Sequence, residues 1–216
     1  MQQQIVTTVL TGRIAAFGPK GEPSAYRKAP REGRVEITPL GLAGDEQADL
    51  VHHGGVEKAV HHYPFDHYPA WAAENPDLAV DWQLPEAFGE NVSTTGWLET
   101  DVCVGDRFRL GSAVVEISQG RDPCWKLGHR LGKPGLVARV VATGRCGWYY
   151  RVIEPGALEA GDRVALLERP HPAWDVRRVF RLLISRDFMP EEVAELGEVA
   201  QLSPSWRKRC TALLGR

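Results

Sequence analysis

The sequence has only four cysteines among its 216 residues, at positions 103, 124, 146 and 210, and no two of them form a Cys-x-x-Cys pair. The missing pair argues against a zinc knuckle, a dithiol redox motif and iron–sulfur ligation. The Gly-x-Gly-x-x-Gly and Gly-x-x-x-x-Gly-Lys-Ser/Thr fingerprints and the Gly-x-Ser-x-Gly elbow are also missing. A nicotinamide or flavin site, a nucleoside triphosphate site and a serine-hydrolase site are therefore not indicated.

The sequence also lacks an excess of charge and a long apolar run. Its 26 basic and 28 acidic residues nearly cancel, so nothing in the overall charge points to nucleic acid or to a membrane surface. The first four residues, Met1 to Gln4, have none of the basic and apolar pattern of a signal peptide. We therefore expect a soluble cytoplasmic protein without structural disulfides.

Short apolar segments separated by glycine and proline make up the chain as far as about residue 165. Several of them alternate apolar and polar residues as half-buried strands do, and the non-repeating loops between them suggest a closed or nearly closed barrel. We therefore expect a mainly β domain over residues 1–168 with a few helices. Strands are expected at 6–17, 34–38, 59–63, 102–110, 114–117, 147–153 and 162–167, and helices at 65–74 and 136–143.

Residues 172–216 differ in character and predict a small domain of three helices. The first helix follows from apolar residues at helical spacing, and the second opens with Pro190 and two acidic residues. The third opens with Ser203 as N-cap and Pro204 at the first helical position. The basic residues of these helices form either a docking or nucleic-acid surface or the solvated side of amphipathic helices: Arg177, Arg178, Arg181, Arg207, Lys208 and Arg209.

The residues around Cys124 present a thiol at the end of a strand. The strand-like run before it stops at Gly120, and Pro123 fixes the backbone directly before the cysteine. Arg121 and Lys126 flank the thiol, and nearby cations favour the thiolate, which is the form that attacks electrophiles and binds soft metals. The alternative is a small apolar residue that closes the end of the barrel.

Five histidines lie in one window, at positions 52, 53, 61, 62 and 67, which raises the possibility of a zinc hydrolase. Adjacent histidines point to opposite faces of an extended chain, however, and no helical pair or cysteine pair completes a tetrahedral set of ligands. His53 precedes Gly54 and Gly55, where the backbone N–H groups can approach an anion or the edge of a pterin. An ordinary glycine turn would use the same residues.

Two other segments carry groups that could hold a ligand. The amide of Asn91, after Gly89 and Glu90, can both donate to and accept from a heterocycle, although a hairpin turn would also use these residues. A loop near the N-terminus contains cations and a hydroxyl that could hold a phosphate or could simply be solvated, namely Lys20, Ser24, Arg27 and Lys28.

The order of these motifs along the chain is more specific than any of them alone. Six segments in register resemble the MOSC domain family, and among its members most closely the bacterial YiiM-type proteins. The resemblance runs from about residue 11 to residue 167, and residues 172–216 resemble the three-helix domain that follows in those proteins. The six segments are Leu40-Gly41-Leu42-Ala43-Gly44-Asp45-Glu46-Gln47, His53-Gly54-Gly55 with Lys58-Ala59-Val60, Phe88-Gly89-Glu90-Asn91, Val104-Gly105-Asp106-Arg107-Phe108, Gln119 to Leu127, and Gly147-Trp148-Tyr149-Tyr150-Arg151-Val152.

The resemblance implies a β-barrel that binds the molybdenum cofactor, a molybdenum–molybdopterin, with the thiolate of Cys124 as the protein ligand of the metal. A soft thiolate among cations suits such a metal. The resemblance places His53 at the family's histidine before Gly-Gly, although His52 duplicates it, and Asp45 and His53 are the candidates for handling protons. The residues that the resemblance and the local chemistry assign to cofactor binding are Ser24, Gly54, Gly55, Asn91, Arg121 and Lys126.

Relatives of this type reduce N-hydroxylated compounds, so the resemblance implies a molybdoenzyme reductase of N-hydroxylated purine bases, hydroxylamines or amidoximes. Trp148 and Tyr149 could stack a flat base at the mouth of the pocket. Because the sequence has no motif for a flavin or a nicotinamide, electrons would come from a separate reductase, for which the C-terminal helices are a possible docking surface. The alternatives are a module that binds or carries the cofactor without turnover, the zinc hydrolase, and a nucleic-acid-binding module that uses the basic helices.

Overall fold

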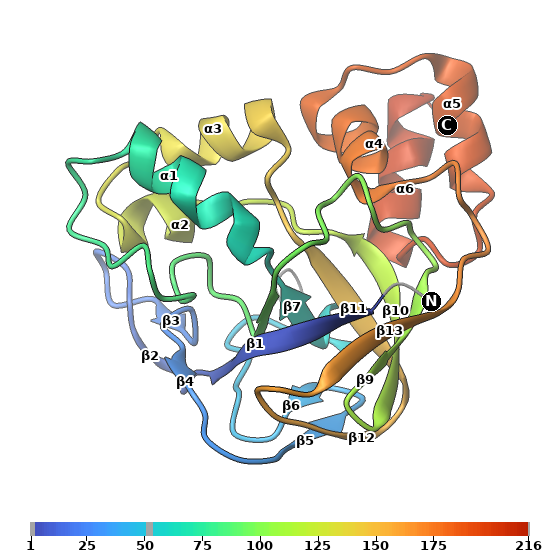
Figure 1. The fold of residues 1–216 in the computed structure, drawn as a ribbon. Helices are drawn as coiled ribbons and strands as arrows, with labels where there is room; N and C mark the ends of the chain where they lie inside the picture. The colour runs from blue at the N-terminus through green and yellow to red at the C-terminus, as the bar shows by residue number, and fades with distance from the viewer. Residues whose placement is uncertain (1–2, 51–53, 216) are drawn as a thin grey trace.

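Seven strands form a closed β-barrel in the computed structural model, which describes residues 3–50 and 54–215. Their order around the barrel is β13, β9, β10, β11, β7, β8 and β1, and β1 closes the barrel on β13 through the pairs Gln3–Ala165 to Ile5–Arg163 (Figure 1). The sequence-based expectation of a mainly β barrel with helices is confirmed. The strands are β1 (Gln3–Thr11), β7 (Val60–His62), β8 (Val92–Thr94), β9 (Arg107–Leu110), β10 (Ala113–Gly120), β11 (Trp148–Glu154) and β13 (Arg163–Glu168).

Further short strands lie outside the closed barrel. The expected strand 6–17 is divided, because β1 ends at Thr11 and the next strand begins at Ala15. Gly12 makes this break: its N–H donates to a side-chain oxygen of Asp45, and a Cβ added here would lie only 2.6 Å from the carbonyl oxygen of Arg27. The short strands are β2 (Ala15–Ala16), β3 (Pro23–Ser24), β4 (Ala29–Pro30), β5 (Val35–Thr38), β6 (Gly41–Leu42) and β12 (Gly156–Leu158).

Three helices lie together over one side of the barrel, and the C-terminal helices lie beside them (Figure 1). They are α1 (Tyr68–Glu74), preceded by the 3-10 turn η2 (Phe65–His67), α2 (Trp125–Arg130) and α3 (Leu136–Thr143), and a second 3-10 turn, η1 (Val56–Lys58), precedes β7. The expected helices at 65–74 and 136–143 are present. The sequence analysis did not foresee α2, which begins directly after Cys124.

The C-terminal residues form α4 (Val176–Phe180), which continues as the π-helix η3 (Arg181–Ser185), then α5 (Pro190–Gly197) and α6 (Pro204–Leu213). Ser203 caps α6 as expected, since its hydroxyl accepts a hydrogen bond from the N–H of Trp206. Buried residues of these helices, among them Phe180 and Trp206, belong to the same apolar core as Phe108 and Tyr150 of the barrel. The helices therefore share a core with the barrel, while their independence as a domain over 172–216 stays a prediction.

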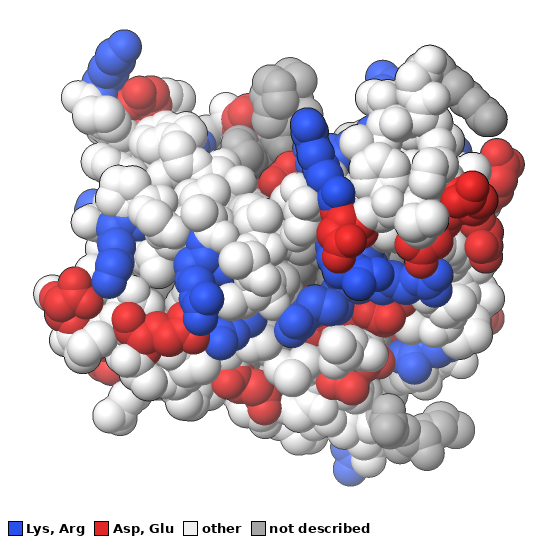
Figure 2. Space-filling model, turned by 90° about the horizontal axis from the view of Figure 1, so that it is seen from above, with Lys and Arg blue, Asp and Glu red and all other residues white. Residues whose placement is uncertain are grey.

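The arginines of the C-terminal helices are mostly engaged within the protein. Arg178 forms an ion pair with Glu192 at 2.7 Å, and Arg207 donates to the carbonyl oxygens of Ala200 and Leu202. Figure 2, which shows the molecule from the helical side, has acidic side chains interspersed with the basic ones. This distribution favours a solvated, internally paired face over a strongly basic docking surface. Among the helices of residues 3–50 and 54–215, none has both the length and the apolar composition needed to cross a bilayer.

Candidate functional site

A pocket lies where β10 ends and the Cys124 loop begins. Its walls come from segments far apart in the sequence: strand β3 and the residues after it, the loop after β6, η1, strand β7, the turn before β8, the residues from Arg121 to the start of α2, and strand β11. Barrel closure brings these segments together. The pocket is lined by Ser24, Ala25, Tyr26, Lys28, Asp45, Glu46, Gln47, Ala48, Asp49, Lys58, His61, Gly89, Asn91, Arg121, Cys124, Lys126 and Tyr149.

Cys124 stands at the end of the longest buried strand of the barrel. All eight residues of β10 are buried, and Arg121 extends the pairing by donating its backbone N–H to the carbonyl oxygen of Gly147 at 3.2 Å. Cys124 is extended, is half-buried and precedes the first turn of α2, whose Leu127 N–H donates to the Cys124 carbonyl oxygen. The thiol is therefore held between a rigid strand and a helix at the pocket wall, and does not lie in the barrel core.

Three side chains that line the pocket bury polar atoms that have no hydrogen-bond partner among the described residues. These atoms are Oη of Tyr26, Nε of Arg121 and Nε2 of His61. An unpaired polar atom in a protein interior costs about 1–3 kcal/mol, so such atoms are usually satisfied by a ligand or water. Burial raises the pKa of the Tyr26 hydroxyl, which therefore stays protonated and can donate. The residues present fit a polar, anionic ligand.

The pocket is rich in cations, among which Arg121 is buried and Lys28 is nearly so. The Nζ of Lys28 forms an ion pair with Oδ2 of Asp45 at 2.7 Å, and the two side chains are 9% and 6% exposed. Burial lowers the pKa of Lys28, while the Asp45 charge opposes that shift. Together with Arg121, Lys58 and Lys126, Lys28 gives the pocket four basic side chains to hold an anion such as a phosphate.

Asp45, a sequence-predicted proton carrier, has both carboxylate oxygens engaged. Oδ1 accepts the N–H of Gly12 at 2.7 Å, and Oδ2 accepts from both Lys28 and the side-chain amide of Asn91. Asn91, a sequence-predicted cofactor ligand, also accepts the backbone N–H of His61 at 3.0 Å. Both residues line the pocket, and their contacts hold Lys28 and His61 in place.

The histidines divide between the pocket and the barrel interior. On β7, His61 faces the pocket, whereas the buried ring of His62 contacts the hydroxyls of Tyr150 and Thr94 at 3.0 and 2.9 Å. Burial and the Arg121 charge hold the pKa of His61 well below its usual range, so its ring is neutral at pH 7. Among the residues that the structure describes, no three His, Cys, Asp or Glu side chains are grouped as metal ligands. His52 and the predicted catalytic His53 lie outside the described residues.

The remaining sequence-predicted site residues are only partly in the pocket. Ser24 and Lys126 line it, but Gly54 and Gly55 do not, and the N–H of Gly55 donates to the side-chain oxygen of Gln47 at 2.9 Å. This glycine turn therefore binds a side chain of its own protein. Of the two aromatic residues expected at the mouth, Tyr149 lines the pocket.

Trp148, also expected at the mouth of the pocket, is instead fully buried inside the barrel. It lies against the ring of His62, with the ring centroids 4.4 Å apart. Strand alternation explains this outcome: neighbouring residues of β11 point to opposite sides of the sheet. The pocket also contains residues that the sequence analysis did not assign to it, among them Tyr26 and His61.

A β-barrel with a half-buried thiol on the wall of a cationic pocket is what the resemblance to the MOSC domain implies, and the model of that family matches residues 49–165. The chain belongs to the MOSC domain family, a family associated with the molybdenum cofactor. It is 40% identical to protein YiiM of Escherichia coli over 200 residues, which cover 93% of this chain and 88% of that protein. It is 42% identical to a protein of Gibberella moniliformis named "Reductase", over 88% of this chain, but it spans only 34% of that protein.

Solved structures agree with this assignment. The crystal structure of YiiM from Escherichia coli superposes with a TM-score of 0.81 at 30% identity. The superposition covers 100% of this chain and 95% of the YiiM chain. The crystal structure of YiiM from Geobacillus stearothermophilus superposes with a TM-score of 0.80 at 27% identity, over 99% of this chain and 100% of that YiiM chain. Both superpositions include the C-terminal helices, so the similarity extends well beyond the residues matched by the family model.

Proposed function

We propose that this protein is a molybdenum-cofactor-dependent reductase of N-hydroxylated compounds, with the thiolate of Cys124 as the protein ligand of the metal. The observation that supports it best is the position of Cys124 on the wall of a pocket with three unpaired buried polar atoms and four basic side chains. A soft thiolate suits molybdenum, and the basic side chains suit the phosphate of the pterin. The family membership and the reductase named among the relatives support the same reaction class.

The residues of the pocket have distinct parts in this proposal. Arg121, Lys28 and Lys126 would hold the anionic end of the cofactor, and Tyr149 would lie against a flat substrate. When bound, the molybdenum cofactor supplies the two-electron chemistry. An N-hydroxylated substrate, two electrons and two protons give the amine and one water. The Tyr26 hydroxyl stays protonated, because burial raises its pKa, and it can donate a hydrogen bond to the ligand.

Two residues, His53 and Asp45, are proposed to handle the protons of this reaction. His53 is a proposed proton donor. Asp45 would act through Lys28, because its own oxygens are engaged. Electrons would come from a separate reductase.

The test is to isolate the protein from cells that make the cofactor and to measure bound molybdenum and the reduction of an N-hydroxylated purine with an artificial dye donor. Cys124→Ser should lose both molybdenum and turnover while keeping the melting temperature of the unsubstituted protein. Cys103→Ser is the matched control, since that buried thiol contacts the carbonyl oxygen of Pro172 outside the pocket. Undiminished molybdenum and turnover in Cys124→Ser would refute the ligand role. Bound molybdenum without turnover of any N-hydroxylated substrate would instead favour a cofactor carrier.

A further inference from the structure

Trp125 differs from every other aromatic residue of the chain in its exposure. All the phenylalanines, tyrosines and tryptophans lie within residues 3–50 and 54–215, and Trp125 is the one among them that is exposed, at 46%. It opens α2, and the residues on either side of it, Cys124 and Lys126, both line the pocket. Trp125 itself does not line the pocket, so its exposed surface lies at the rim.

The indole of Trp125 is fixed by contacts with the β2–β3 hairpin and with its own helix. Its ring centroid lies 6.4 Å from that of Phe17 and 5.8 Å from that of His129. A Cβ added at Gly18 would lie 2.6 Å from the indole, so glycine lets the ring lie against the backbone of the hairpin. His129 joins the two elements, because its Nε2 lies 2.6 Å from the carbonyl oxygen of Phe17. The indole is therefore packed on one side before any ligand binds, and the rest of its surface faces solvent.

A row of aromatic rings connects Trp125 to the wall of the pocket. The ring of Phe17, which contacts that of Trp125, also contacts that of Tyr26, with centroids 5.6 Å apart. Tyr26 lines the pocket, and the guanidinium carbon of Arg121 lies 5.7 Å from the centre of its ring. Centroid separations of about 4.5–7 Å are those of favourable aromatic pairs. The rim and the pocket wall thus form one packed unit, in which the position of the indole is set by the pocket.

The pocket and its rim offer different contacts to a ligand. The basic side chains of the pocket suit an anion, whereas the ring of an N-hydroxylated purine is flat and uncharged. An aromatic face binds such a ring by stacking, and it does so with little regard to the ring's substituents. A side chain that is held in place in advance loses little conformational entropy when the ring binds. Trp125 has both properties and directly follows the proposed metal ligand.

We propose that Trp125 is a specificity-determining residue, whose exposed indole stacks the flat ring of an aromatic N-hydroxylated substrate at the rim of the pocket beside Cys124. The inference rests on the proposed function and narrows its substrate class to N-hydroxylated aromatic rings, in preference to aliphatic hydroxylamines. It gives Trp125 the stacking role that the sequence analysis expected of Trp148, which is buried inside the barrel.

The first test measures the reduction of an N-hydroxylated purine and of methylhydroxylamine by the cofactor-containing protein with an artificial dye donor. Trp125→Leu keeps an apolar side chain against Phe17 but has no aromatic face. It should raise KM for the purine at least about fivefold, the low end of the effect of removing an aromatic platform from under a base. The value of kcat should not change, because the contact is made equally in the ground state and the transition state. KM for methylhydroxylamine should also stay the same.

Two further variants show whether the effect belongs to the aromatic face. Trp125→Phe should restore most of the affinity for the purine, since phenylalanine also has a face on which a ring can stack. Met189→Ala is the control, because it removes an apolar side chain that is 62% exposed and does not line the pocket. Its KM values should equal those of the unsubstituted protein for both substrates.

The second test detects binding without turnover, from the NMR signals of the indole N–H groups. The signal of Trp125 is the one that is absent in Trp125→Phe. It should shift when the purine is added and should not shift with methylhydroxylamine. The signals of the fully buried Trp71 and Trp148 should not move with either compound.

An unchanged KM for the purine in Trp125→Leu would overturn the proposal. An equal rise of KM for methylhydroxylamine would also overturn it, because stacking acts on the flat ring alone. If Trp125→Leu does not fold, the NMR test decides, and a Trp125 signal that does not move with the purine rejects the stacking role. If no N-hydroxylated compound is reduced but the purine still shifts this signal, the reductase proposal fails and the stacking role of Trp125 is retained.

Discussion

Asp45 and Lys28 form a buried ion pair, with Oδ2 and Nζ 2.7 Å apart, on the wall of the pocket. The two residues come from different loops, and Asn91 and Gly12 complete the hydrogen bonding of the carboxylate. Such a pair is held in place by its surroundings, and either charge alone would be left in an environment that disfavours it.

Asp45→Asn should therefore destabilise the protein by roughly 3–5 kcal/mol, the loss typical of removing one member of a buried pair. The amide cannot neutralise Lys28, and in either orientation its NH2 group would face a donor, either the Gly12 N–H or the Lys28 and Asn91 side chains. Equilibrium unfolding in urea measures the change. Glu46→Gln is the control, because its carboxylate pairs with the largely exposed Arg13, and its loss should be much smaller. Similar losses in the two variants would contradict the buried-pair account.

The acid stability of the protein should depend on His62. Burial lowers the pKa of His62 from its usual 6.5 to about 3 in the folded state, so the unfolded chain binds a proton more readily than the folded protein between these values. Stability should therefore fall as the pH decreases from about 6.5 towards about 3, by up to roughly 5 kcal/mol from this group.

His62→Gln removes the titration while offering a donor and an acceptor to Tyr150 and Thr94. Urea unfolding across this pH range should show a shallower acid loss than in the unsubstituted protein. His129→Gln, at an exposed histidine that contacts the carbonyl oxygen of Phe17, should retain the original slope. An unchanged slope in His62→Gln would show that other groups govern the acid limb.

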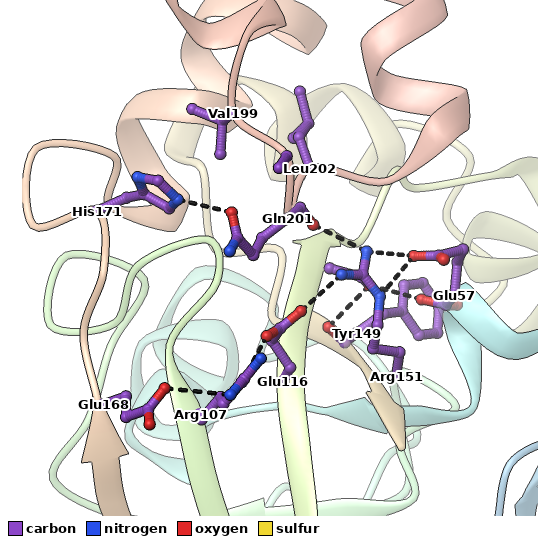
Figure 3. Close-up of polar contacts among 12 residues, drawn as sticks. Glu57, Arg107, Glu116, Tyr149, Arg151, Glu168, His171, Val199, Gln201 and Leu202 are labelled. Atoms are coloured by element: carbon purple, nitrogen blue, oxygen red, sulfur yellow. Dashed lines mark hydrogen bonds and ion pairs between the residues drawn. The ribbon is translucent and has the colours of Figure 1, made fainter. Parts of the chain in front are cut away.

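Substitution of Arg151 should destabilise the protein more than substitution of most of its other arginines. Its guanidinium contacts Glu57, Glu116 and the carbonyl oxygen of Gln201 at the same time, and only 17% of its side chain is exposed (Figure 3). Lysine keeps the charge but cannot reach three acceptors with a planar group. Arg151→Lys should therefore cost roughly 2–4 kcal/mol through lost charge-assisted hydrogen bonds.

Thermal unfolding monitored by circular dichroism measures the loss of stability in Arg151→Lys, with Arg107→Lys as the control. Arg107 also contacts Glu116, but it is 39% exposed and its other partner, Glu168, lies at the surface. A loss in Arg107→Lys as large as that in Arg151→Lys would mean that Glu116 alone accounts for the effect.

The sequence predicts those parts of the fold that local patterns determine. The strand before Gly120 and the Ser203–Pro204 start of α6 follow from alternation and capping, which depend on neighbouring residues. The break of the first strand at Gly12 does not, because it depends on Asp45 and Arg27, which reach Gly12 only after folding. Helix α2 was missed for a related reason, since six residues are too few to show a periodic pattern.

The residues of the candidate site are likewise predictable only where they lie close together in the sequence. Cys124, Arg121 and Lys126 are close in sequence, and their chemistry is visible there. His61 was not selected, because only barrel closure shows which of two adjacent histidines faces the pocket, although alternation on β7 requires that one of them does. The engagement of Asp45 by Lys28 joins residues of two loops, and spacing alone gives no signal for it.

Barrel closure has a consequence for synthesis of the protein. Strand β1 pairs with β13, so β1 must wait for the synthesis of residues 163–165 before its pairing is complete. Contacts of such large sequence separation make folding slow relative to helical domains of similar size. The pocket includes residues from Ser24 to Tyr149, and α6, whose Arg209 contacts Asp122 beside it, is made after all of them. Ligand binding should therefore report completed folding, and a chain stalled before residue 203 should lack the contacts of α6 with the end of β10 and Asp122.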